Sequence, residues 1–369
     1  MGNDARMSIA ARDTRRLSRL RLAAQRVGGS EGTPEPTQVV RWMLALQAQD
    51  LPGAKWSVGL RTPASTLSDV DDALGRGEIV RSWPMCGTLH LTTAADIGWM
   101  LRLTAPRTLR ALRARHQALG IDGAAIGAAT DVAGALLVGG RSASRAEMFA
   151  AFEQAGIDTA GQRGIHLLGA LHQNRLVCQG PMRGNEQLCV LLDEWVPHPR
   201  RLDGDEALGE FVGRYLRSHG PATLDDFCWW TKLSVREAKA GLAATDVPLD
   251  ELTIDGTRYW MAPELAQLSA GSVAALPGFD EMLLGYRDRS ASLPDKYAAA
   301  IVPGNNGMFL STMVADGRVV GTWRRRRTSA GVTVTASPLE PLSNRVRARF
   351  VDAADRYGRF LGVPVVVAG

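Results

Sequence analysis

Hydrophobic and polar positions along the 369-residue chain repeat one order of elements, several helices followed by a hairpin of two strands. In the first occurrence, three helices and a hairpin are expected over Arg15–Val27, from Thr33-Pro34 onward, over Ser68–Gly77 and over Glu78–Thr92. A further helix, Ile97–His116, leads out of this unit. The pattern therefore predicts a small module of helices and one hairpin.

The same order recurs twice. In the second unit, Ser144 begins a helix with the spacing of a capping box, and a hairpin is expected over Arg175–Val196. In the third unit, the helix Glu206–His219 and two short helices precede a hairpin that turns at Asp255-Gly256. Two short helices with a tight connection and a hairpin are typical of a winged helix-turn-helix.

Beyond Pro277 the pattern changes to strands. We expect a strand over Phe279–Tyr286, a hairpin turning at Asp316-Gly317, a strand over Val332–Ala336 and a final helix over Asn344–Leu361. The predicted fold class is α+β, with three tandem winged helix-turn-helix units and a C-terminal strand-rich α/β cap. The expected domains are 12–120, 121–200, 201–274 and 275–369.

Composition narrows the function classes. The net charge of +5 is compatible with a nucleic-acid partner but argues only for non-specific attraction. No apolar run approaches the roughly 20 residues that a bilayer requires, so we expect no membrane and a cytoplasmic location.

Four widely spaced cysteines are expected to be small buried side chains. The six histidines show no metal spacing, and nucleotide motifs are absent, so neither a metal nor a cofactor is expected.

The string Leu46-Gln47-Ala48-Gln49-Asp50 stands at the end of the second predicted helix. Side chains at i and i+2 point apart on a helix but share one face of extended backbone. Pro52 disfavours helix at the residue before it, so Gln47 and Gln49 can converge and hold one water molecule between their amide oxygens. Spacing alone also fits ordinary polar side chains at a frayed helix end.

Several arginines are candidates for contact with DNA. The run Arg324-Arg325-Arg326-Arg327, directly after the predicted strand Val319–Trp323, offers four adjacent cations to phosphates. A solvated strand end is the alternative. Arg287 and Arg289 flank a turn and can reach a groove, or they pair with Asp280, Glu281 or Asp288. His90 and the pair Trp229-Trp230 are expected to belong to the core.

Gln47-Ala48-Gln49 resembles the QxQ signature of the AlkZ-type winged-helix DNA glycosylases, enzymes that unhook interstrand crosslinks. Other strings agree with that family from about Arg15 to Leu361, namely Gly87-Thr88-Leu89-His90-Leu91, Val190–Trp195, His219–Thr223, Phe279–Ser290 and Val319–Trp323. A related branch carries QxD, whereas Gln49 points to the QxQ branch. Cys86 stands where the resemblance leads us to expect arginine, which puts a phosphate contact at the first hairpin in doubt.

The resemblance implies a monofunctional DNA glycosylase with Gln47 and Gln49 as catalytic residues. An N7-alkylated purine is cationic and leaves as a neutral base, so a site of amides needs no strong general acid. The expected partner is double-stranded DNA carrying alkylated purines, including interstrand crosslinks, and we expect a monomer. The alternatives are a non-catalytic winged-helix DNA-binding protein or regulator, and an interaction scaffold without a DNA role.

Overall fold

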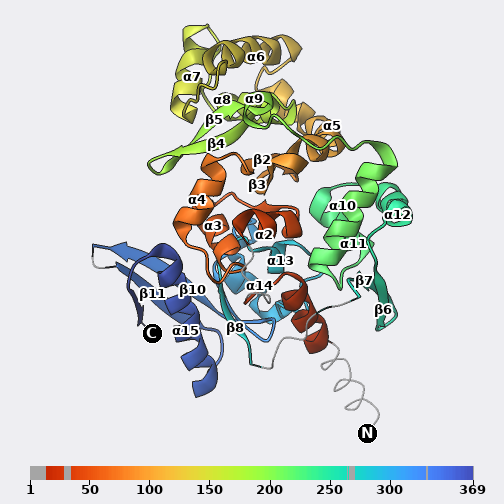
Figure 1. The fold of residues 1–369 in the computed structure, drawn as a ribbon, viewed down its shortest axis with the longest axis vertical. Coiled ribbons are helices and arrows are strands. Elements are labelled where there is room, and N and C mark those ends of the chain that lie inside the picture. Colours follow the sequence, from red (N-terminus) through yellow and green to blue (C-terminus); the bar gives the residue numbers. More distant parts are fainter. Residues whose placement is uncertain (1–13, 29–34, 264, 266–270, 330, 369) are drawn as a thin grey trace. The chain divides into compact units, whose positions relative to one another are not determined.

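The structure, a computed structural model, describes residues 14–28, 35–263, 265, 271–329 and 331–368 (Figure 1). They form two compact units. The first unit extends to residue 70 and resumes at residue 208, and the second covers residues 71–207. The fold is mixed α+β.

The first unit begins with three helices, which cover residues 14–24, Pro36–Met43 (α2) and Leu51–Gly59 (α3). Pro36 starts α2, so it takes the place that the sequence suggested for Pro34; Thr33 and Pro34 lie outside the described residues. The helix α3 corrects the sequence prediction, which placed none there. Its residues 53–59 are buried, so it lacks the polar face by which a helix is usually recognised.

Residues 204–261 form the helices and the hairpin that the sequence predicted for this region. The elements are α10 (Gly204–His219), α11 (Leu224–Thr231), α12 (Val235–Ala244), β6 (Asp250–Ile254) and β7 (Thr257–Met261). Asp255 and Gly256 both have positive φ, 48° and 73°, as a tight hairpin turn requires. Ala222 pairs with Trp260 as an additional bridge, so the hairpin is tied to the segment between α10 and α11.

The C-terminal part of the first unit is a sheet in the order β12-β11-β10-β9-β8. The strands are β8 (Val273–Leu276), β9 (Thr312–Ala315), β10 (Arg318–Thr328), β11 (Gly331–Pro338) and β12 (Val365–Ala368). They pair antiparallel except β11 and β12, which are parallel. The predicted turn at Asp316-Gly317 and the predicted helix Asn344–Leu361 (α15) are confirmed. Tyr357 of α15 packs on Trp323 of β10, with ring centroids 5.5 Å apart.

Two expectations for this part are wrong. The four arginines do not follow a strand end, because β10 continues through all of them and pairs with β11 as far as Thr328. The segment predicted as a strand over Phe279–Tyr286 contains instead the one-turn helix α13 (Glu281–Leu284). Asp280 caps this helix, because its Oδ1 accepts a hydrogen bond from the Met282 amide at 3.0 Å. A second short helix, α14, covers Asp295–Ile301.

The second unit holds two hairpins and several helices. Its strands are β2 (Ile79–Met85), β3 (Thr88–Thr93), β4 (Val177–Arg183) and β5 (Glu186–Leu191), in the order β3-β2-β4-β5. The hairpins that the sequence assigned to separate units are thus joined in one sheet by the pairing of Arg81 with Gln179. Joining them leaves fewer exposed strand edges.

Helix α4 (Leu67–Gly75) contains the point after residue 70 at which the second unit begins along the chain. The following helices of the second unit are α5 (Ala94–Ala118), α6 (Gly123–Leu137), α7 (Arg145–Gln154), α8 (Arg163–Gln173) and α9 (Leu192–Trp195). The capping box at Ser144 is confirmed: Ser144 Oγ accepts from the Glu147 amide at 3.1 Å. Among the described residues, no single helix is long and apolar enough to span a bilayer; α5 and α6 pass that test only as a pair bent by 102°.

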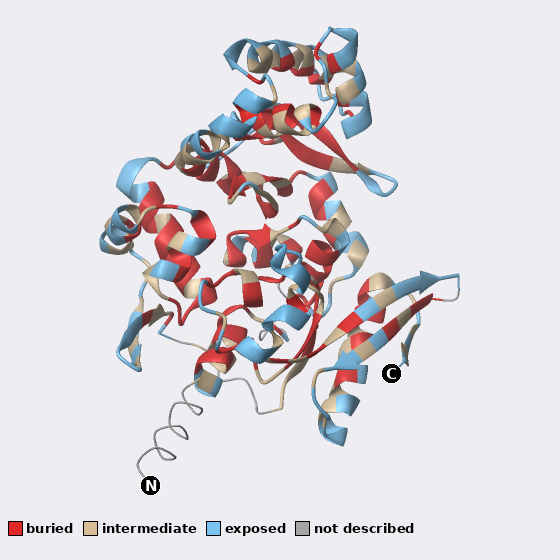
Figure 2. Ribbon diagram, turned by 180° about the vertical axis from the view of Figure 1, so that it is seen from behind, coloured by how far each residue is buried: buried red, intermediate tan, exposed pale blue. Residues whose placement is uncertain are grey.

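Buried residues mark the core of each unit (Figure 2). In the first unit, the large buried side chains include Trp56 of α3 and Phe350 of α15. In the second unit, Ala129, Ala133 and Leu137 of α6 pack on helices α7 and α8. Cys178 and Cys189 are buried as expected, whereas Cys86 and Cys228 are only half-buried, which corrects the expectation for those two. His90 is buried, and its Nδ1 lies 2.9 Å from the carbonyl oxygen of Thr88, which confirms its placement in the core.

Candidate active site

Gln47 and Gln49 lie in the non-helical connection between α2 and α3. Leu44 has a φ of 68°, which ends α2 well before the glutamines, so they do not belong to a helix end. Leu46–Gln47 forms the short strand β1, and the chain bends at Gln49 before α3 begins. Leu46 and Ala48 are buried, whereas Gln47 is half-buried and Gln49 is exposed. Burial alternates from Leu46 to Gln49 as it does along extended backbone, and the chain bends at Gln49.

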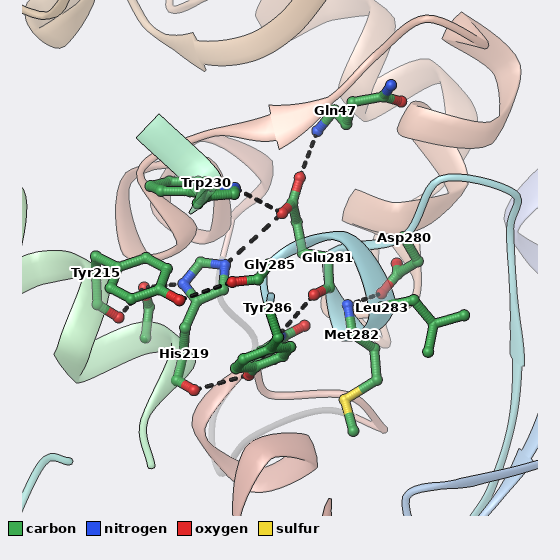
Figure 3. A network of polar contacts seen from close by, with 12 residues as sticks. Gln47, Tyr215, His219, Trp230, Asp280, Glu281, Met282, Leu283, Gly285 and Tyr286 are labelled. Atoms are coloured by element: carbon green, nitrogen blue, oxygen red, sulfur yellow. Dashed lines mark hydrogen bonds and ion pairs between the residues drawn. The ribbon is translucent and has the colours of Figure 1, made fainter. Parts of the chain in front are cut away.

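The backbone of Gln47 is held by a buried carboxylate. The Gln47 amide donates a hydrogen bond of 2.7 Å to Oε1 of Glu281, at the start of α13 (Figure 3). The second carboxylate oxygen, Oε2, accepts a hydrogen bond of 2.9 Å from the indole nitrogen of Trp230 in α11. Glu281 is only 1% exposed. The segment with the glutamines is thus bound to α13, and the Glu281 carboxylate links it in turn to Trp230 of α11.

His219 at the end of α10 lies beside this carboxylate. Its Nε2 is 3.9 Å from Glu281 Oε2, too long for a hydrogen bond, and its Nδ1 is 2.9 Å from Ser218 Oγ. Burial lowers the pKa of His219 below the usual range of histidine, although the Glu281 carboxylate opposes this shift. The imidazole is therefore neutral at neutral pH. Its ring stacks on Tyr215, with centroids 4.7 Å apart.

The side chain of Gln47 points away from Glu281 (Figure 3). Its Oε1 is buried, and no group in the described ranges of the chain donates a hydrogen bond to it. A buried acceptor without a donor costs about 1–3 kcal/mol, and most buried polar atoms in folded proteins are paired. This oxygen is therefore available to a donor from outside the protein, such as a water molecule.

Asp280 and Arg61 fix the helix that carries Glu281. Arg61 Nη1 and Nη2 lie 2.9 and 3.0 Å from the two carboxylate oxygens of Asp280, and the Ser57 hydroxyl donates to Oδ2 at 2.6 Å. Burial disfavours the charged carboxylate, but the Arg61 guanidinium and these hydrogen bonds hold the pKa of Asp280 below its usual range. Gln25 adds a hydrogen bond of 3.1 Å to the Glu281 carbonyl oxygen. The start of α13 is thereby rigidly placed.

Arg325 is joined to the segment that follows Gln49. Its Nη2 lies 3.3 Å from Asp50 Oδ2, and its Nη1 donates to the Tyr357 hydroxyl at 3.1 Å. A Cβ at position 53 would lie 2.6 Å from the same Asp50 oxygen, so Gly53 leaves room for this side chain. Of the four consecutive arginines, Arg325 therefore has an intramolecular role, whereas Arg324, Arg326 and Arg327 are exposed on β10.

The other two candidate arginines are also placed by intramolecular contacts. Arg287 is exposed and pairs with Asp225 at 3.1 Å, rather than with the carboxylates expected from sequence. Arg289 donates to the Leu283 carbonyl oxygen at 2.7 Å and lies over the Trp229 ring at 5.3 Å. Trp229 is 41% exposed, so of the tryptophan pair only Trp230 is a core residue as expected.

Sequence reasoning missed Glu281, Trp230 and His219 as part of this site. The only available signal was that two of them stand in strings that resemble the family, Phe279–Ser290 and His219–Thr223. Glu281 was considered only as an ion-pair partner for an arginine. No cluster of three His, Cys, Asp or Glu side chains suited to a metal ion occurs in the part of the chain that the structure describes.

Comparison with known proteins gives consistent results. The family model described as "DNA glycosylase AlkZ-like" matches residues 40–360. An interstrand DNA cross-link repair glycosylase from Streptomyces sahachiroi is 28% identical over 315 residues, which cover 79% of this chain and 82% of that protein. The structure of Streptomyces sahachiroi DNA glycosylase AlkZ matches with a TM-score of 0.78 at 24% identity, over 96% of this chain and 99% of that chain. This last likeness shows the fold. The chain therefore belongs to the AlkZ-like DNA glycosylase family, whose members hydrolyse N-glycosidic bonds.

Proposed function

We propose that this enzyme hydrolyses the N-glycosidic bond of cationic N-alkylated purines, of the N7-alkylguanine type, with Gln47 and Gln49 positioning the attacking water. The observation that carries this proposal is the Oε1 atom of Gln47, which is buried and receives no hydrogen bond from the described residues. A water molecule that donates to this oxygen would be oriented for attack on the sugar. Gln49, two residues later, supplies the second amide.

The chemistry of a cationic lesion suits a site made of amides. The positively charged purine leaves as a neutral base, so its departure requires no proton from the enzyme. As the bond breaks, positive charge develops on the sugar, and amide oxygens directed at it stabilise that charge. Attack by the water forms the new bond at the anomeric carbon, and the water loses a proton to solvent. Uncharged bases lack this leaving ability and are expected to react poorly.

Interstrand crosslinks are the second part of the substrate proposal. The Streptomyces sahachiroi relative is described as an interstrand DNA cross-link repair glycosylase. A crosslink through two N7-alkylated purines presents the same cationic leaving group as a monoadduct. We infer that the enzyme also unhooks such crosslinks, because its chemistry depends on the charge of the base and not on the size of the alkyl group.

Duplex DNA would be held by the winged-helix units and by the exposed arginines. We infer that residues 204–261, with two short helices and a hairpin, act as a winged helix, and that the preceding hairpins belong to two related units. The exposed Arg324, Arg326 and Arg327 are the strongest candidates for phosphate contacts, and Arg287 is a further one. We propose that the enzyme acts as a monomer in the cytoplasm, without a cofactor.

The test is base release. The protein is incubated with duplex DNA carrying N7-methylguanine, with a crosslinked duplex and with undamaged DNA, and the freed base is measured by mass spectrometry. We expect release from the first two substrates and none from the third. A folded protein that binds duplex DNA at about 50 mM salt but frees no base would instead be a non-catalytic DNA-binding protein.

A further inference from the structure

We propose that Glu281 is a positioning residue of this site, whose carboxylate fixes the backbone of Gln47 and thereby aims the Gln47 side chain. This inference rests on the proposed function. Glu281 does not touch the reacting atoms, because its two oxygens are directed at the Gln47 amide and the Trp230 indole (Figure 3). It acts on the reaction only through Gln47.

The contact with Gln47 has the geometry of a strong hydrogen bond. The distance of 2.7 Å between the Gln47 amide nitrogen and Glu281 Oε1 is at the short end for an amide donor and an ionised acceptor. The bond joins residues 234 positions apart in the chain, so it ties the segment between α2 and α3 directly to α13. Because the donor is the main chain of Gln47, the bond limits rotation about the backbone from which the catalytic amide extends.

Glu281 itself is held from several sides. Its carbonyl oxygen accepts from Gln25, and its own helix is capped by Asp280, which Arg61 grips through two nitrogen atoms. The nearby Phe279 has a φ of 63°, which residues other than glycine rarely adopt. Strained backbone of this kind persists where the surrounding structure enforces it. The surroundings therefore determine where the carboxylate lies.

A purely structural role explains the carboxylate less well. Moving a carboxylate from water into the core is costly, and the neighbouring His219 is neutral at neutral pH and supplies no compensating cation. Packing around Trp230 would be served as well by an apolar side chain or a neutral amide. A carboxylate differs from an amide in offering two acceptor oxygens, and the Gln47 amide and the Trp230 indole use one each.

This difference gives a direct test by substitution. In Glu281→Gln the side chain has one acceptor oxygen for two donors, so the Gln47 amide and the Trp230 indole compete for it. Adding Trp230→Phe removes one donor and lets the oxygen serve Gln47. We expect Glu281→Gln to lower the single-turnover rate of base release about tenfold or more, with the Kd for duplex DNA within about threefold of wild type. The double variant should recover part of that rate.

A matched control separates positioning from a general decrease in stability. In the second unit, the buried carboxylate of Asp96 accepts a hydrogen bond from the Trp99 indole at 3.0 Å and another from the Thr93 hydroxyl at 2.7 Å. Asp96→Asn disturbs these two hydrogen bonds, together with an ion pair of Asp96 with the partly exposed Arg200 at 3.2 Å, and does not involve Gln47. It should lower the melting temperature comparably and leave the rate of base release near that of wild type.

A measurement of Gln47 itself completes the experiment. In protein labelled with ¹⁵N-glutamine, the Gln47 amide proton should resonate downfield and move upfield in Glu281→Gln. The role of Glu281 is contradicted if wild type releases base but Glu281→Gln reduces the rate no more than Asp96→Asn does. It is also contradicted if the Gln47 amide resonance does not move, or if the double variant recovers nothing. If wild type releases no base, the proposed function itself is wrong. The outcomes above, in a wild type that does release base, contradict only the role of Glu281.

Discussion

The backbone and the side chain of Gln47 have different tasks. The backbone amide is bound tightly by Glu281, whereas the side-chain oxygen is buried and without a donor among the described residues. A side chain that is firmly placed but not saturated with hydrogen bonds is suited to orient a water molecule. This arrangement is the basis of our proposal that an amide, a weak catalytic group, contributes to breaking a glycosidic bond.

We expect substitutions among the consecutive arginines of β10 to have two kinds of effect, one on the affinity for duplex DNA and one on the rate of base release. Arg324→Ala with Arg326→Ala removes two exposed cations, so we expect weaker duplex binding. The slope of log affinity against log salt should become shallower by about one for each phosphate that the variant no longer binds. Arg325→Ala removes the ion pair with Asp50, next to Gln49, and should lower the rate of base release more than the affinity.

Titrations of fluorescent duplex at several salt concentrations, together with single-turnover rates, measure both effects. If Arg325→Ala reduced affinity and salt dependence as strongly as the exposed pair did, the assignment of Arg325 to an intramolecular role would be wrong.

At this scale, the sequence predicted part of the candidate site. Gln47 and Gln49 were proposed from their spacing before Pro52 and from the resemblance of their string to a family. Glu281 could not be paired with Gln47, because their contact spans 234 positions and neither residue has a local feature that requires it. Long-range contacts of single side chains leave no periodic signal in one sequence.

At the scale of elements, the site depends on how α2 ends and α3 begins. Hairpins were predicted correctly where the turn residues specify the structure, as at Asp255-Gly256 and Asp316-Gly317. The helix α3 was missed because residues 53–59 are all buried and show no amphipathic period. The helix α13 was mistaken for a strand because one turn is too short for periodicity to reveal.

The close packing of α3 against α15 predicts an unusual response to alanine. A Cβ at Gly59 would clash with the Phe360 ring, so Gly59→Ala should lower the free energy of unfolding by about 1–3 kcal/mol, despite the better helix propensity of alanine. In α6, a Cβ at Gly127 meets nothing within 4 Å, and Gly127→Ala should be neutral or stabilising. Thermal and urea unfolding would measure both; equal effects of the two substitutions would contradict the packing described.

At the scale of the whole molecule, the chain leaves the first unit after residue 70 and returns to it at residue 208. The sequence predicted four consecutive modules, because local patterns cannot show that distant segments share a core. The boundaries of those modules stay a prediction. The described residues of the candidate site, from Gln25 to Arg325, all belong to the first unit.

The stability of the second unit should depend on a buried histidine. Burial lowers the pKa of His172 from 6.5 to about 3, with a smaller contribution from Arg81. The unfolded chain therefore binds a proton below about pH 6.5 that the folded chain excludes, and stability falls as pH decreases from there toward 3, by up to about 1.4 kcal/mol per pH unit. His172→Gln should make this decrease shallower. Urea unfolding between pH 4 and pH 8 tests it, and an unchanged pH profile in the variant would refute the prediction.

The central claim is that two amides carry the hydrolysis of a cationic lesion. Its most direct test compares the single-turnover release of N7-methylguanine by wild type, Gln47→Ala, Gln49→Ala and the double variant, at protein concentrations that saturate the DNA. We predict that each single substitution lowers the rate about tenfold or more while DNA affinity and melting temperature stay close to wild type. Wild-type rates in the folded double variant would contradict the claim.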